Sequence, residues 1–123
     1  MNKFDLFLWM VFLHFLFDFY IQTKSNGLIK SKEWWKNRHK QSGKRKYNYI
    51  MGLLMHSFVW SFAILLPFYY SQQRIYYGVL MINIIVHAFT DNAKTNKKSI
   101  SSFQDQLIHI IQIFVTWCIL IWR

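Results

Sequence analysis

Three apolar stretches of this chain each carry a histidine and an aspartate four residues apart, and a fourth stretch carries a histidine. These residues are His14 and Asp18, His87 and Asp91, Asp105 and His109, and the separate His56. Ionisable side chains are costly in apolar surroundings, so they are normally retained for a function and face one another. Neutral imidazole and carboxylate are ligands for zinc, iron and manganese. The seven residues therefore predict a metal site, with enough ligands for one ion and its supporting groups or for two ions.

The same residue types also suggest what such a site would do. A catalytic ion would supply a bound water as nucleophile, and one of the three aspartates would act as its general base. Zinc is the expected ion, with iron or manganese as alternatives. Gln22, Lys94 and Gln106 are candidate substrate-binding residues, and Gln106 is also placed to orient a carboxylate. Cys118 is the sole cysteine and lies in apolar sequence, which argues against a thiolate site.

Two other interpretations of the histidines and aspartates stay open. Polar side chains between helices also form purely structural hydrogen-bond networks. They also line proton or ion paths. A path would need polar groups through the outer half of each stretch, where only Asn83, Gln112 and Thr116 reach deeper.

The composition predicts the elements that position these residues. The chain is 54% hydrophobic, 20% aromatic and only 16% charged. Its apolar residues form four blocks near the length of about 20 residues that crosses a bilayer: 4–21, 49–70, 75–93 and 103–122. The expected fold is all-α, a single membrane domain over residues 1–123 built as a four-helix transmembrane bundle with up-down-up-down topology.

Details of the blocks refine this expectation. The first block is not expected to be a signal peptide, because it contains His14 and Asp18 and lacks a small-x-small cleavage site. Pro67 is expected to help end the second helix. Ser101 or Ser102 is expected to cap the last helix.

Basic residues predict the orientation. The loop 23–48 contains nine of them: Lys24, Lys30, Lys32, Lys36, Arg38, Lys40, Lys44, Arg45 and Lys46. Three more, Lys94, Lys97 and Lys98, flank the last connection, whereas only Lys3, Arg74 and Arg123 mark the other side. Short basic loops stay in the cytoplasm, so both termini are expected outside a bacterial inner membrane. The loop is expected to meet anionic lipid, and its interleaved Lys, Arg and Trp make nucleic acid a disfavoured alternative partner.

Spacing predicts where the site lies in depth. Each of the four intramembrane histidines is seven residues from the basic-loop end of its block, and each aspartate is about three. At about 1.5 Å per residue, the imidazoles lie roughly 10 Å and the carboxylates roughly 5 Å inside one membrane face. We therefore expect both layers to meet at the cytoplasmic end of the bundle.

Together these motifs resemble a known family. The matching elements are His14-x-x-x-Asp18-Phe19-x-x-Gln22, His56, His87-x-x-x-Asp91-x-x-Lys94 and Asp105-Gln106-x-x-His109. They resemble a family of small bacterial and phage membrane proteins of unknown function, over nearly the whole chain. The resemblance implies a polytopic helical membrane protein of bacterial or phage origin and brings no activity. A more distant similarity, to membrane-bound metal-dependent hydrolases, is an analogy.

Three functional hypotheses follow. The first is a metal-dependent hydrolase that acts on a lipid or headgroup-level substrate, motivated by the depth of the site, its basic rim and its ligand set. The second is a metal-ion or proton transporter. The third is a non-catalytic phage or bacterial membrane effector that binds a host partner. The oligomeric state, including a homo-oligomer, stays open.

Overall fold

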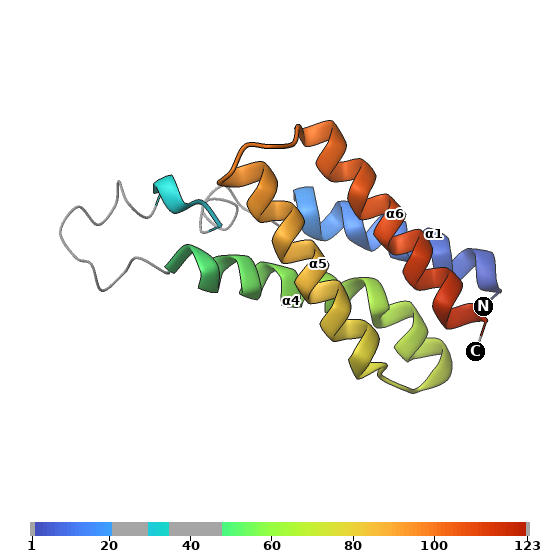
Figure 1. Ribbon diagram of the computed structural model, residues 1–123. Helices are drawn as coiled ribbons and strands as arrows, with labels where there is room; N and C mark the ends of the chain where they lie inside the picture. The colour runs from blue at the N-terminus through green and yellow to red at the C-terminus, as the bar shows by residue number, and fades with distance from the viewer. Residues whose placement is uncertain (1, 21–29, 35–47, 123) are drawn as a thin grey trace.

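The computed structural model describes residues 2–20, 30–34 and 48–122 of the chain (Figure 1). Within these ranges the chain forms five helices and no strand, which confirms the predicted all-α class. The helices are α1 (Lys3–Phe15), the π-helix η1 (Leu16–Tyr20), α4 (Asn48–Gln72), α5 (Tyr77–Thr95) and α6 (Ser102–Ile121).

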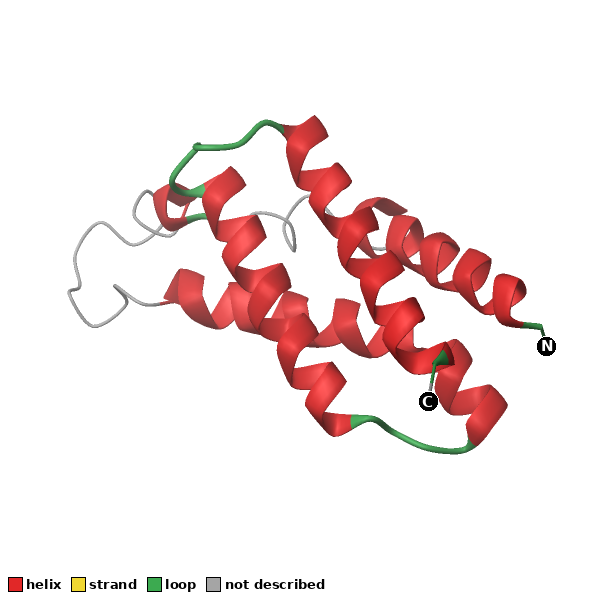
Figure 2. Ribbon diagram, turned by 45° about the vertical axis from the view of Figure 1, so that its right-hand side comes forward, coloured by secondary structure: helices red, strands yellow, loops and turns green. Residues whose placement is uncertain are grey.

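Each of the four helices α1, α4, α5 and α6 packs against two of the others. Both α4 and α6 pack against α1 and against α5. The start of α1, the end of α6 and the connection 73–76 lie at one end of the molecule, and the connection 96–101 lies at the other (Figures 1 and 2). The indole Nε1 of Trp117 donates to the carbonyl of Lys3 at 2.7 Å and ties α6 to the start of α1. The end of α1, the start of α4, the end of α5 and the start of α6 therefore converge, and these are the segments that carry the histidines and aspartates.

Two of the helices, α4 and α6, are long and apolar enough to cross a membrane. The sequence predicted four such helices, so this count differs from the expectation. The α-helical part of the first block has only 13 residues, because η1 interrupts it. The 19-residue α5 carries Asn83, His87 and Asp91, which lower its mean hydropathy although all three side chains are buried.

The helix ends agree with the sequence at one expected position and differ at another. Ser101 caps α6, because its hydroxyl accepts a hydrogen bond from the backbone N–H of Gln104. In turn, the side-chain oxygen of Gln104 accepts a hydrogen bond from the backbone N–H of Ser101. The prediction that Pro67 helps end its helix is wrong, because α4 continues to Gln72. Pro67 and Phe68 are both buried, so packing holds the helix together beyond the proline.

The apolar core lies mainly toward one end of the molecule and the buried histidines and aspartates toward the other, although the polar Asn83 and Thr116 are also buried. The apolar core consists of Leu6, Met10, Trp60, Ile64, Leu65, Phe68, Leu80, Ile84, Ile113 and Leu120. Most of these residues lie toward the 73–76 end. The outer surface is also apolar, and each long helix exposes large hydrophobic side chains, for example Phe12, Phe58, Ile82 and Ile111. Monomeric soluble proteins rarely expose so continuous an apolar surface.

Candidate metal centre

Two groups of side chains can each hold a metal ion, and both contain Asp18. The first group is Asp18, His56, His87 and Asp91, and the second group is Asp18, Asp105 and His109. In each group the potential ligand atoms lie within 4.8 Å of one another. Six of the seven ligands predicted from sequence thus come together, from η1, α4, α5 and α6. We refer to these six residues as the His/Asp cluster.

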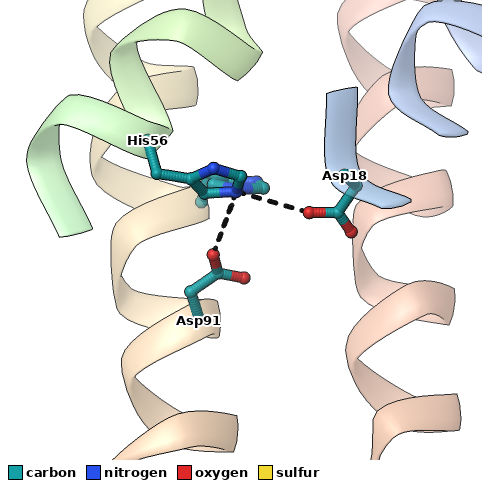
Figure 3. A group of neighbouring side chains, drawn as sticks. Asp18, His56 and Asp91 are labelled. Carbon is teal, nitrogen blue, oxygen red and sulfur yellow. Dashed lines mark ion pairs between the residues drawn. The ribbon is translucent and has the colours of Figure 1, made fainter. Parts of the chain in front are cut away.

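In the first group, His56 lies between two carboxylates (Figure 3). Its Nε2 is 3.3 Å from Oδ1 of Asp18 and 3.4 Å from Oδ2 of Asp91. The Nε2 of His87 is 3.3 Å from the same Asp91 oxygen. Both Nε2 atoms are buried, and within the described residues neither has a hydrogen-bond partner. Each of the two imidazoles therefore presents a buried ring nitrogen to a carboxylate oxygen.

The second group joins Asp18 of η1 to Asp105 and His109 of α6. The Nε2 of His109 is 3.3 Å from Oδ1 of Asp105. That carboxylate oxygen is buried and accepts no hydrogen bond from the part of the chain described. His109 also approaches Oδ1 of Asp91 at 3.2 Å. Asp91 therefore faces histidines of both groups.

His14, the seventh predicted ligand, lies beside the cluster rather than in either group. Its Nδ1 accepts the indole N–H of Trp60 at 2.9 Å, and its Nε2 is 3.0 Å from Oε1 of Gln106. An indole N–H can only donate, so Nδ1 is unprotonated and Nε2 carries the proton that Gln106 accepts. Both ring nitrogens are engaged, and the structure gives His14 the role of a hydrogen-bonding neighbour.

The π-helical turn η1 explains why the side chains of His14 and Asp18 have different partners. Residues four apart on an α-helix share a face, and the sequence predicted that they would act together. The wider turn over Leu16–Tyr20 changes this relation. His14 contacts Trp60 of α4, whereas Asp18 reaches His56 and Gln106.

Gln106 orients two carboxylates at once. Its Nε2 donates to Oδ2 of Asp18 at 2.9 Å and to Oδ2 of Asp105 at 3.0 Å. Because its oxygen accepts from His14, the amide is fixed in one orientation. Gln106 therefore lies beside carboxylates, as the sequence suggested. Both the oxygen and the nitrogen of its amide form hydrogen bonds within the protein.

Two lysines neutralise aspartates of the cluster. Lys30 is buried and donates to Oδ2 of Asp91 at 2.9 Å. Lys94, beyond the end of the third apolar block, donates to Oδ2 of Asp105 at 3.1 Å. The third candidate substrate-binding residue, Gln22, lies outside the described residues.

Sequence reasoning did not single out Trp60 or Lys30. The ring of Trp60 stacks on His87 with centroids 4.1 Å apart, and His87 stacks on His109 at 4.2 Å. Trp60 follows His56 by four residues on the same helix, so helical spacing contained a signal for it. Lys30 had no such signal, because it is one of nine basic residues in a loop of similar composition. The Asn96 side chain, at the end of α5, accepts a hydrogen bond from the backbone N–H of Lys32 and donates one to the backbone carbonyl of Lys30. These two bonds hold the segment that carries Lys30 against α5.

Comparison with known protein families gives a match over most of the chain. The family described as "Protein of unknown function (DUF3307)" matches residues 6–123, a range that contains the whole cluster. No curated protein and no solved structure matches the chain.

Proposed function

Because the chain belongs to the DUF3307 family, whose description names no activity, we propose a function from the cluster itself: a metal-dependent hydrolase embedded in a membrane. One observation carries the proposal. The buried Nε2 atoms of His56 and His87 face carboxylate oxygens at 3.3–3.4 Å, within the described residues, without hydrogen bonds.

The 3.3 Å between Nε2 of His56 and Oδ1 of Asp18 suits two ligands of one ion better than a structural network. Zinc ligands lie about 2.0–2.1 Å from the ion, so two ligands of a tetrahedral site are about 3.3–3.4 Å apart. Hydrogen bonds between charged groups are shorter, about 2.7–2.9 Å. The same cluster contains bonds of that shorter kind, from Lys30 to Asp91 and from Gln106 to Asp18, both at 2.9 Å. Within the described cluster the contacts of 3.2–3.4 Å all involve histidines, whereas the lysine and glutamine bonds to its aspartates are 2.9–3.1 Å long.

We assign Asp18, His56 and His87 as the ligands. Three protein ligands leave a position open for water, as catalytic zinc sites require. Asp91 lies next to both histidines and is held by Lys30, so it is placed to accept a proton from that water. The ion would lower the pKa of the water toward neutrality.

The membrane setting rests on the outer surface. Only 39% of the apolar window of α4 and 28% of that of α6 is buried, unlike the core helix of a soluble protein. We propose that α1 with η1 and α5 also cross, which gives the four-helix transmembrane bundle. Residues 3–20 span about 27 Å as a helix, and the polar side chains of α5 point inward. The positive-inside rule then places the cluster at the cytoplasmic side of a bacterial cell membrane, with both termini outside.

Charge and shape favour an anionic lipid as substrate. With neutral imidazoles, three aspartates against Lys30 and Lys94 leave one negative charge, which a divalent ion turns into one positive charge. A positive site near the headgroup level suits a phosphorylated group. A groove of about 280 Å³ between α5 and α6 has a mainly apolar lining that includes Ile82, Val86, Ile108 and Ile111. It offers room for an acyl chain beside the bundle.

The test begins with metal analysis. We expect the protein, purified in detergent, to contain a divalent ion, to lose it to chelator and to melt at a lower temperature without it, because a ligand that binds only the folded state stabilises it. Hydrolysis of phosphorylated lipids in mixed micelles should require the ion. A metal-free protein that is indifferent to chelator would overturn the proposal.

Variants separate ligands from neighbours. His87→Gln and Asp18→Asn should each lose the ion, whereas His14→Gln should retain it, since His14 lies in neither group. Asp5→Asn, near the opposite end of α1, is the matched control and should bind metal as the wild type does. Equal metal content in His87→Gln and wild type would remove the first group as the site.

A further inference from the structure

The second group offers a metal site of its own. Asp105 and His109 come from adjacent turns of α6, and Asp18 completes the group from η1. All three residues are at most 8% exposed. The assignment of the first ion to Asp18, His56 and His87 leaves Asp105 and His109 without a role.

An unpartnered atom marks this group. Oδ1 of Asp105 is fully buried, and within the described residues it accepts no hydrogen bond, whereas Oδ2 of the same carboxylate accepts from both Lys94 and Gln106. A buried carboxylate oxygen without a donor is expensive. It lies 3.3 Å from Nε2 of His109, the same separation that joins His56 to Asp18 in the first group. The repeated distance indicates a second set of ligands.

We propose that the cluster binds two divalent ions and that Asp18 bridges them. His56 and His87 complete the first site, and Asp105 and His109 complete the second. Paired ions in hydrolytic sites lie about 3.5–4 Å apart and are commonly joined in this way. Asp91 faces histidines of both groups and lies beside both sites. This inference rests on the proposed function, since it adds an ion to the site described there.

The second ion has a consequence for the ligand. One divalent ion leaves the cluster with one positive charge, and a second leaves three. Such a charge in a buried site needs an anion to balance it. We expect the phosphate group of the proposed substrate class to supply this anion, so phosphate and the second ion should bind cooperatively. By linkage, each should raise the affinity for the other by the same factor.

The experiment counts ions. Detergent-purified full-length protein is loaded with Mn²⁺ with and without inorganic phosphate, freed of unbound ion and analysed for metal. We expect about two ions per chain with phosphate, and a paramagnetic resonance spectrum of exchange-coupled Mn²⁺. One ion per chain, with an uncoupled spectrum, overturns the second site but leaves the proposed function standing. No bound ion overturns both.

A variant tests the assignment of residues. Asp105→Asn should reduce the content from about two ions to about one and abolish the coupled spectrum, whereas Asp5→Asn should change neither. Circular dichroism and elution volume establish that the variant is folded. If Asp105→Asn does not fold, the wild-type spectrum with and without phosphate still decides the question. Two coupled ions in folded Asp105→Asn would contradict the assignment.

Discussion

At the scale of single residues, the cluster depends on a chain of hydrogen bonds that starts at an indole. Trp60 donates to His14, His14 to Gln106, and Gln106 to Asp18 and Asp105. Each donor fixes the orientation of the next group. The carboxylates are therefore held by residues that need not touch an ion themselves.

Trp60→Phe removes the first donor of this chain. Nδ1 of His14 then stays buried without a partner, which should lower the free energy of unfolding by about 1–3 kcal/mol. Thermal unfolding in detergent measures the change. The matched control is Trp9→Phe, because the Trp9 side chain is half exposed on the outer face of α1. Equal melting temperatures for the two variants would show that the indole bond contributes nothing.

Lys30→Met removes the buried partner of Asp91. An uncompensated buried charge should destabilise the protein by about 3–5 kcal/mol. Lys98→Met is the control, since Lys98 and Glu33 form an exposed pair 3.8 Å apart and such pairs contribute little. Chemical unfolding of both variants measures the difference. A loss no larger than that of the control would mean that Lys30 is held only by its backbone.

The sequence contained most of the residues at this scale but not their partners. Spacing by four residues correctly brought His87, Asp91, Asp105 and His109 toward one place. It could not separate His14 from Asp18, because the apolar residues around Asp18 do not distinguish a π-helical turn from an α-helical one. Nor could it find the contact between Lys30 and Asp91, which lie 61 positions apart.

At the scale of elements, helix ends decide where the ligands start. Asp105 lies in the first turn of α6, directly after the cap at Ser101. A negative charge is favourable there. The sequence placed this cap and the ends of α4, α5 and α6 within about two residues, because Ser, Asn and Lys clusters interrupt the apolar blocks.

Ser101→Ala should cost about 1 kcal/mol of stability, since the hydroxyl satisfies the backbone N–H of Gln104. Ser102→Ala, one residue later and inside the helix, is the control and should have little effect. Thermal unfolding of both variants gives the comparison. A larger loss in Ser102→Ala would place the cap one residue further along.

At the scale of the whole molecule, two counts of helices able to cross a membrane differ. Composition predicted four, and length with mean hydropathy supports two, α4 and α6. The difference arises because mean hydropathy counts every residue of a helix. Asn83, His87 and Asp91 lower the value for α5, yet all three side chains are buried against other helices and not on its outer surface.

Cysteine labelling tests the four crossings. Cys118→Ser gives a cysteine-free background, into which Lys3→Cys, Gln73→Cys and Lys98→Cys are introduced singly. Four crossings place residues 3 and 73 outside and residue 98 inside, so an impermeant maleimide applied to intact cells should label only the first two. If only α4 and α6 cross, residues 73 and 98 share a side and label alike.

The apolar half of the interior also determines what the protein does to a membrane that contains it. Met10, Ile64 and Ile113 have no exposed surface, and they follow the cluster one or two helical turns toward the 73–76 end. Packed hydrocarbon of this kind is a poor route for water and protons, although Asn83, Gln112 and Thr116 hydrogen-bond to one another in the same half. If the helices cross a membrane as proposed, we therefore expect a cell to accumulate this protein and keep its proton-motive force, even though the helices carry charge deep inside.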